Sequence, residues 1–199
     1  MAEEAPLDAG DAKAWLAATD AVLAAGAPAA VPCGSCTACC RAAQFILVTR
    51  EETDALAAIP SALLFPAPGR PGDYVLGHDA AGHCPMFDGT ACTIYAARPH
   101  ACRTYDCRVF AATATFPDTP EQREVAAHSR RWRFAEARPV GALQATRAAA
   151  RFLTTHRDAL ADVLRNQPLA IALAAIQVRS LFRDGSEPAP AEVRAALRP

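Results

Sequence analysis

Cysteine is the residue type in this chain with the clearest chemical meaning. All eight cysteines fall between residues 33 and 107, and residues 108–199 contain none. Their thiolates are soft, charged donors that bind zinc and iron well. We therefore treat all eight as candidate metal ligands: Cys33, Cys36, Cys39, Cys40, Cys84, Cys92, Cys102 and Cys107.

The first four cysteines form one short motif, Cys33-Gly-Ser-Cys36-Thr-Ala-Cys39-Cys40. A Cys-x-x-Cys turn puts two sulfurs on one side of a tight loop, each about 2.3 Å from a shared metal. Here the turn repeats, and Cys-x2-Cys-x2-Cys is the spacing by which bacterial ferredoxins hold three corners of a 4Fe-4S cluster. A zinc ribbon usually supplies two separated pairs instead. The spacing favours an iron-sulfur cluster, of the 4Fe-4S type, over zinc.

The last cysteine of the motif needs its own explanation, because neighbouring side chains diverge by about 100° on a helix and about 180° on a strand. We expect Cys40 to serve a second centre or to lie beside the ligands of the first. Eight cysteines divide into two four-ligand sites, or into one site plus spare thiols. We expect the triplet of Cys33, Cys36 and Cys39 to take its fourth ligand from the downstream cysteines.

The cellular compartment decides whether such thiols stay reduced. The chain begins Met-Ala-Glu-Glu-Ala-Pro, which lacks the positive start and the apolar stretch of a signal peptide. The longest apolar stretch, residues 168–176, is far shorter than the roughly 20 residues that span a bilayer. We expect a cytoplasmic protein without a membrane partner, in which a cysteine cluster binds metal rather than forming disulfides.

The net charge gives no drive towards nucleic acid or an anionic membrane, because 20 basic residues face 21 acidic ones. An excess of base is local: residues 121–199 hold 13 arginines and eight acids. These arginines are spread over several predicted helical faces, so no nucleic-acid partner is expected. The expected partner is a metal ion or cluster, and a protein partner stays open.

The elements around the first motif can be read from local signals. Residues 11–26 favour a helix that stops at Gly26, and residues 44–49 favour a strand. Thr49-Arg-Glu-Glu52 matches a capping box, which predicts a short helix that runs to about Ile59.

Proline and glycine punctuate the rest of the chain. Residues 60–91 hold five prolines and five glycines, which predicts loop and turn. Thr119 before Pro120 is a helix start, since proline suits the first helical position. The density of apolar residues predicts that the helix over 168–183 is largely buried. Further helices are expected at about 140–153, 156–165, 168–183 and 188–197.

The predicted fold class is mainly α. We expect an irregular cysteine-rich metal-binding module with few or no short strands, packed on N- and C-terminal helices. Residues 1–110 would form an N-terminal helix plus the cysteine-cluster metal-binding domain. Residues 111–199 would form a helical C-terminal extension that packs on it.

Three motifs carry a family resemblance. The first motif is followed by Phe45-Ile-Leu-Val-Thr-Arg-Glu-Glu; the others are Cys84-Pro-Met-Phe-Asp-Gly-Thr-Ala-Cys92-Thr-Ile-Tyr and Arg98-Pro-His-Ala-Cys102-Arg. Over residues 33–107 the chain resembles the CxxCxxCC cysteine-cluster family, the YkgJ-like zinc- or iron-chelating proteins. One branch of that family resembles flagellin lysine N-methylases, in which an iron-sulfur cluster is associated with methyl transfer. This chain is short for that branch and shows no Gly-rich nucleotide-binding loop. The resemblance implies a metal site and leaves the activity open.

Arg98 and Arg103 belong to the matched motif and are candidate cofactor-binding residues. A four-thiolate centre with zinc or a doubly charged cluster carries a net charge of about −2, which guanidinium groups offset while donating hydrogen bonds to sulfur. Arg41 and Arg108 also neighbour cysteines, but only sequence proximity speaks for them.

His83 and His100 lie beside cysteines and are expected to be bystanders, because eight thiols are available. The sequence shows no Gly-rich phosphate loop, Ser/His/Asp pattern or HExxH helix, so it does not decide whether the protein is an enzyme. We expect a protein that holds an iron-sulfur cluster or zinc through its cysteine cluster, as a redox or methyl-transfer accessory. The alternatives are a structural zinc-binding interaction module and a metal-handling protein without catalysis.

Overall fold

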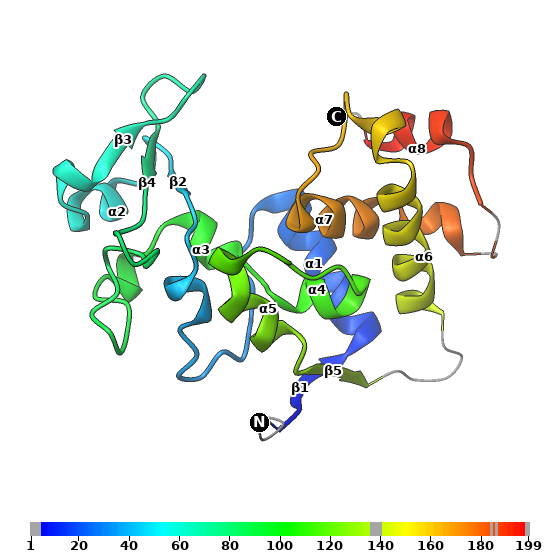
Figure 1. Ribbon diagram of the computed structural model, residues 1–199, viewed down its shortest axis with the longest axis horizontal. Helices are drawn as coiled ribbons and strands as arrows, with labels where there is room; N and C mark the ends of the chain where they lie inside the picture. The colour runs from blue at the N-terminus through cyan, green and yellow to red at the C-terminus, as the bar shows by residue number, and fades with distance from the viewer. Residues whose placement is uncertain (1–4, 136–140, 184, 186, 198–199) are drawn as a thin grey trace. The chain divides into compact units, whose positions relative to one another are not determined.

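A computed structural model describes residues 5–135, 141–183, 185 and 187–197 (Figure 1). The chain forms two compact units. We call residues Met1–Ala25, Cys107–Pro117 and Ala126–Pro199 the helical unit, and residues Gly26–Asp106 and Asp118–Val125 the cysteine unit. About 49% of the structure is helix and 11% is strand, so the predicted mainly α class is confirmed. The predicted division into residues 1–110 and a helical extension over residues 111–199 stays a prediction.

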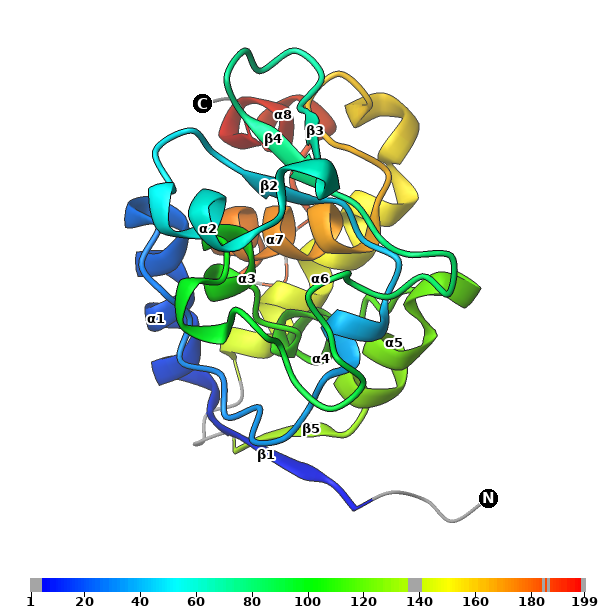
Figure 2. The same cartoon turned by 90° about the vertical axis from the view of Figure 1, so that its left-hand side faces the viewer.

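The helical unit is built around two α-helices that lie against each other, α6 and α7 (Figures 1 and 2). Helix α1 contacts both of them, and a two-stranded parallel sheet pairs β1 with β5, Leu7 opposite Trp132. Its elements are β1 (Leu7–Asp11), α1 (Ala12–Ala25), α4 (Arg108–Thr113), β5 (Trp132–Ala135), α6 (Ala142–Thr155), η5 (Arg157–Leu160), α7 (Pro168–Val178), η6 (Arg179–Phe182) and α8 (Pro190–Leu197).

Small side chains allow α6 and α7 to approach closely. Ala149 of α6 and Ala175 of α7 are 0% exposed, and their small side chains add little bulk between the two helix axes. Leu153 of α6, also 0% exposed, belongs to the same apolar core. Helix α7 is apolar on nearly every face, which is typical of a helix that is buried all round. The predicted burial of this helix is confirmed.

A bidentate ion pair joins the first and last parts of the helical unit. The Arg179 guanidinium on η6 binds the Asp20 carboxylate of α1 through two N–O contacts, of 2.8 Å and 2.5 Å. The arginine side chain is only 16% exposed, so water competes poorly for this contact.

The cysteine unit contains short elements joined by turns. A three-stranded antiparallel sheet has the order β2-β4-β3, and α2 packs beside it (Figure 2). Its elements are η1 (Ala38–Arg41), β2 (Ile46–Val48), α2 (Thr53–Ala58), η2 (Ser61–Leu63), β3 (Leu64–Pro66), β4 (Tyr74–Leu76), η3 (Tyr95–Ala97), α3 (His100–Thr104) and η4 (Pro120–Gln122). Helix α5 (Arg123–Ser129) begins in this unit and ends in the helical unit.

Elements with strong local signals form where they were predicted. Helix α1 starts after Asp11, whose Oδ1 accepts the N–H of Ala14 at 2.8 Å, and it ends before Gly26, whose φ is +64°. The predicted strand over 44–49 is β2, and the predicted helix stop near Ile59 matches the end of α2. The later helices at 140–153, 168–183 and 188–197 are also present, as α6, α7 with η6, and α8.

Two predictions of local structure were wrong. Residues 60–91 are not all loop, because β3 and β4 pair as a hairpin with Leu64 opposite Leu76. Three-residue strands are too short to show an alternating pattern, so the prolines and glycines of the connecting turn dominated the signal. Residues 156–165 form only η5 and turns rather than an α-helix. Gln167 is extended (φ −132°, ψ 138°), as proline requires of the residue before it, so this segment cannot continue into α7.

Glu52 connects two elements of the cysteine unit. Its Oε2 accepts the N–H of Thr49 at 2.7 Å, which is the carboxylate half of the predicted capping box. Its Oε1 accepts the N–H of His100 at the start of α3. One carboxylate therefore holds the turn before α2 and the helix that carries Cys102.

None of the helices in the described residues is long and apolar enough to cross a membrane.

We predict that Glu52→Ala destabilises the cysteine unit by about 1–3 kcal/mol, because two backbone N–H groups lose a charged acceptor. Urea denaturation of the metal-free chain, with amide exchange at His100 as a local probe, measures the effect. Glu51→Ala is the matched control, since Glu51 is exposed and forms a salt bridge with its neighbour Arg50. Equal losses in the two variants would contradict the bridging role of Glu52.

Candidate metal centre

The first two cysteines lie on a tight turn. The N–H of Cys36 donates to the carbonyl oxygen of Cys33 at 2.9 Å, and Gly34 between them has φ +54°. The N–H of Ala38 donates to Cys36 Sγ at 3.5 Å. An N–H directed at the sulfur stabilises negative charge on it. The Cys-x-x-Cys spacing has thus formed the turn that it predicted.

Cys39 and Cys40 follow on η1, and a backbone contact joins this element to the loop that follows β4. The N–H of Cys84 donates to the carbonyl oxygen of Cys40 at 2.8 Å. Cys84 is 9% exposed and packs with Val48 and Leu76 in the apolar cluster of the unit, to which Cys40 also contributes. Cysteines 44 positions apart in the sequence are therefore held by adjacent backbone segments.

Two aspartates order the loops around Cys84 and Cys92. Asp79 Oδ1 accepts the N–H groups of Ala81 (2.9 Å) and His83 (2.8 Å). Asp88 Oδ1 accepts the N–H groups of Thr90 and Ala91, both at 2.8 Å. These backbone hydrogen bonds are the main reason that the pKa of each carboxyl is lowered. The two aspartates stabilise turns. Their lowered pKa values make both carboxylates weak bases, which suits neither to general-base catalysis.

Cys92 and Cys102 complete the downstream group. Cys92 pairs with Phe87 in an isolated antiparallel bridge, and its carbonyl oxygen accepts the N–H of Tyr95 at 3.3 Å. Cys102 lies on α3, where its N–H donates to the carbonyl oxygen of Pro99 at 2.9 Å. Short hydrogen-bonded turns fix the backbone at both positions.

The thiols of Cys39 and Cys40 interact directly. A side-chain hydrogen bond from Cys40 is the main cause that lowers the pKa of Cys39 from 9.0 to about 7. The same hydrogen bond, followed by burial and the charge of Cys39, raises the pKa of Cys40. Whether Cys40 serves a second centre or lies beside the ligands of the first stays a prediction. The first proton lost by the pair comes from Cys39.

Three downstream thiols share the electrostatic environment of this pair. Burial is the main cause that raises the pKa of Cys102 to about 12, and the charges of Cys39, Cys84 and Cys92 add to it. Burial likewise raises the pKa of Cys84, with contributions from Cys92 and Cys39. We call Cys39, Cys40, Cys84, Cys92 and Cys102 the thiol group. Because each thiolate in it disfavours another, a cation nearby would favour the ionised forms.

Arg98 is the described basic residue that acts on the thiol group. Its positive charge lowers the pKa of Cys39 and opposes the rise in the pKa of Cys102. Tyr95 orients it: the guanidinium carbon lies 3.9 Å from the centre of the tyrosine ring, and one N–H donates to the tyrosine carbonyl oxygen at 2.8 Å. The cofactor-binding role of Arg98 stays a prediction. The sequence did not indicate Tyr95 as the residue that positions it.

The other basic candidates have different surroundings. Arg103 is half-buried on α3, and its carbonyl oxygen accepts the N–H of Ala29 at 2.8 Å. Arg41 pairs with Glu124 at 3.1 Å. Arg108 lies in the helical unit, where one N–H donates to the carbonyl oxygen of Ala9 at 3.3 Å. The case for Arg103 stays a prediction from the motif.

The histidines beside the cysteines pack against other groups. His83 contacts the ring of Phe87 edge to face, with ring centres 5.9 Å apart. The ring of His100 lies over Gly26, 3.3 Å from the position that a Cβ would take there. A side chain at Gly26 would therefore press on this ring.

Cys107 differs from the other seven cysteines because it belongs to the helical unit. It is 9% exposed, and its Sγ accepts the indole N–H of Trp132 at 3.2 Å. This hydrogen bond gives the thiol a structural environment of its own. Its ligand role stays a prediction from the sequence.

A small cavity of about 250 Å³ adjoins the loops that carry the thiol group. Arg41 and His83, which are chain neighbours of two of the cysteines, contribute to its wall. Glu121, Arg123 and Glu124 complete the charged part of the lining. Two acids and two arginines cancel, so the cavity does not select ions of one sign.

The donor set fits a soft metal, and the arrangement of the donors needs adjustment to hold one. In the described residues, no three His, Cys, Asp or Glu side chains converge closely enough to hold a metal ion. The thiol group nevertheless shares one electrostatic environment and lies on loops and short helices rather than on long rigid elements.

Comparison with known proteins agrees with this donor set. Residues 32–128 match the family model "CxxCxxCC: Putative zinc- or iron-chelating domain". The chain therefore carries a domain of the CxxCxxCC family, and the resemblance predicted from residues 33–107 is confirmed. No curated protein and no solved structure matches the chain. The family description supports metal binding as the property of this domain.

We predict that Cys39 is the first of the thiol group to be alkylated in the metal-free protein. Its lowered pKa places the rise of the thiolate, and hence of the rate, near pH 7, whereas Cys84 and Cys102 need more alkaline solution. Iodoacetamide labelling between about pH 6 and pH 10, read out by peptide mass spectrometry, measures the alkylation midpoint of each cysteine. A Cys39 midpoint at the ordinary thiol pKa of 9.0 would contradict the prediction.

We further predict that Arg98→Gln shifts the alkylation midpoint of Cys39 to higher pH, because the thiolate loses a neighbouring positive charge. Arg41→Gln serves as the control, since Arg41 directly follows Cys40 in the chain but pairs with Glu124. Equal midpoints in Arg98→Gln and the unaltered protein would exclude an electrostatic role for Arg98.

Proposed function

We propose that the cysteine unit binds a metal centre through ligands drawn from Cys33, Cys36 and the thiol group, with Arg98 offsetting the negative charge of the ligated sulfurs. The observation that carries the proposal is the mutual influence of five thiols that come from four separate segments of the chain. Uncompensated thiolates in such proximity repel one another, and a bound cation removes that cost. The family match supports the same conclusion.

An iron-sulfur cluster, of the 4Fe-4S type, is our first candidate for the centre. The Cys-x2-Cys-x2-Cys run supports it, and the downstream cysteines would supply the remaining ligand. When bound, such a cluster supplies one-electron redox chemistry, in support of redox or methyl-transfer reactions. The residues of this chain would bind the cluster, orient it and set the charge around it. Arg98 and Arg103 would donate hydrogen bonds to its sulfurs.

Zinc in a closed four-thiolate site is the second candidate. The burial of Cys84 in the apolar cluster favours it, because a structural zinc site shields its ligands from water. The metal would then order a unit with short elements and long turns, and the protein would act as an interaction module. Reversible binding of iron or zinc, as in a metal-handling protein, is a variant of this candidate.

Metal and acid-labile sulfide analysis on protein purified without oxygen decides between the two candidates. For a cluster we expect brown protein, broad visible absorption, and iron with matching sulfide. Colourless protein with stoichiometric zinc and no sulfide would establish the zinc site instead. Protein that binds neither metal after anaerobic reconstitution would refute the proposal.

We predict that replacing one cysteine of the thiol group, as in Cys102→Ser, lowers the metal content strongly, because serine oxygen is a poor ligand for a soft metal. Elemental analysis of the purified variants measures this. Cys107→Ser is the comparison, since Cys107 belongs to the helical unit. Retained metal removes Cys107 from the ligand set. If each downstream cysteine can be replaced singly without loss of metal, the proposed ligand set is wrong.

We also predict that zinc affinity of the metal-free protein rises with pH between about 6 and 8, with proton release on binding. The sign follows from the raised pKa values of Cys40, Cys84 and Cys102, which keep these thiols protonated at neutral pH, so the metal must displace their protons. Calorimetry in two buffers of different ionisation enthalpy measures the released protons. An affinity that does not vary with pH would exclude these thiols as ligands.

A further inference from the structure

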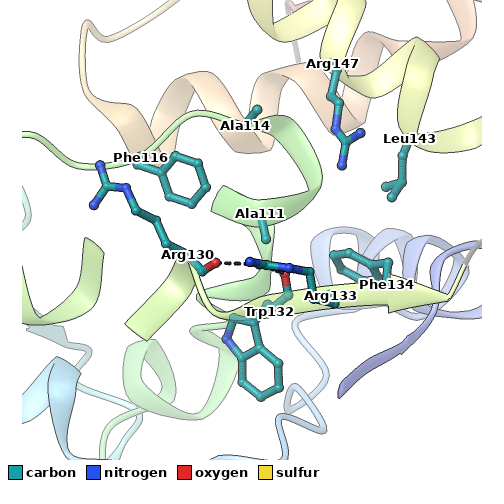
Figure 3. A pocket seen from close by; sticks show the side chains of 9 residues that line it. All are labelled: Ala111, Ala114, Phe116, Arg130, Trp132, Arg133, Phe134, Leu143 and Arg147. Carbon is teal, nitrogen blue, oxygen red and sulfur yellow. Dashed lines mark hydrogen bonds between the residues drawn. The ribbon is translucent and has the colours of Figure 1, made fainter. Parts of the chain in front are cut away.

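The helical unit holds a second site whose chemistry differs from that of the thiols. A cavity of about 450 Å³ lies between α4, β5 and α6 (Figure 3). Its volume falls in the range of small-molecule sites. Aromatic side chains form much of its wall, and three arginines supply its charge. The residues that carry the argument are Phe116, Arg130, Trp132, Arg133, Phe134 and Arg147.

Arg147 is the least satisfied of these arginines. It projects from α6, and Figure 3 shows its guanidinium pointing towards the strand β5. Its Nε is buried, and among the described residues it has no hydrogen-bond partner. A buried N–H of a charged group without an acceptor is costly, so this position is suited to an acceptor from a ligand.

The other two arginines are held by uncharged groups. Arg133 donates to the carbonyl oxygens of Arg130 and Trp132, at 2.5 Å and 3.1 Å. The guanidinium carbon of Arg130 lies 4.8 Å from the ring centre of Phe116. No acidic side chain lines the cavity in the described residues, and none of the three guanidinium groups has an ion-pair partner there.

We propose that this cavity binds a small aromatic organic phosphate. Three positive charges call for a ligand that carries more than one negative charge, and guanidinium groups match phosphate oxygens in geometry. A free inorganic ion would leave the aromatic walls uncovered. A flat ring would lie against Phe116 or Phe134 while the phosphate faces Arg147. The proposal does not rest on the proposed metal centre, because the thiol group lies in the other unit.

Calorimetry with phenyl phosphate, benzoate and inorganic phosphate tests the proposal on the full chain. We expect saturable binding of phenyl phosphate at millimolar concentration or below, with benzoate and inorganic phosphate at least about fivefold weaker. Absence of saturable phenyl phosphate binding overturns the proposal. Benzoate that binds as tightly as phenyl phosphate overturns the dianion requirement, and inorganic phosphate that binds as tightly overturns the aromatic one.

Variants on one helix assign the binding to the cavity. Arg147→Met should weaken phenyl phosphate binding at least about tenfold, because the ligand loses a charged donor. Arg147→Lys should retain part of the affinity. Arg151→Met is the matched control, since Arg151 is exposed on the same helix and does not line the cavity. Equal weakening by Arg151→Met refutes the site. A circular dichroism melting curve shows that each variant is folded, and an unfolded Arg147→Met leaves Arg147→Lys and Arg133→Met to make the same test.

Discussion

The crowding of ionisable thiols is the constraint on which the cysteine unit depends. Each thiolate formed in the thiol group disfavours the next, and burial adds to this cost, so the pKa values of Cys40, Cys84 and Cys102 are raised. Two features of the chain relieve the repulsion: the hydrogen bond between the first two thiols of the group, and the positive charge of Arg98. A bound cation would act in the same direction and more strongly, because it carries more charge and lies closer to the sulfurs. The ionisation behaviour of the metal-free unit is thus consistent with the metal chelation that its family description names.

Carboxylates take over the ordering of loops that have little apolar core. Glu52, Asp79 and Asp88 each accept two backbone N–H groups, and these contacts define the turns between short elements. Asp73, between β3 and β4, accepts one backbone N–H, from Arg50, and forms an ion pair with the Arg70 side chain. Because these oxygens are engaged by the backbone, they are poorly placed to compete with sulfur for a metal. The carboxylate oxygens therefore order the loops, and the cysteine sulfurs remain available for a soft cation.

The helical unit follows a different physical logic. Its stability comes from the close approach of α6 and α7 and from apolar side chains that are almost fully buried. Its charged groups fall into two kinds. Arg179 forms a bidentate pair with Asp20. In the cavity, backbone carbonyl oxygens hold Arg133 and an aromatic ring contacts Arg130. Guanidinium groups held in this way keep their charge available, and we base the proposed anion site on that difference. One chain thus combines a soft-metal donor set with a positively charged cavity.

The sequence by itself determined the properties that depend on nearby residues. The cysteine motifs carried the family resemblance, and signals at Gly26 and Pro168 predicted helix ends, because glycine and proline act within a few residues. The tertiary structure decided what depends on distant residues. It paired Leu7 with Trp132, brought Cys84 to Cys40, and divided the arginines between an ion pair and a cavity. Burial and long-range hydrogen bonding set these outcomes, and neither leaves a periodic signal in the sequence.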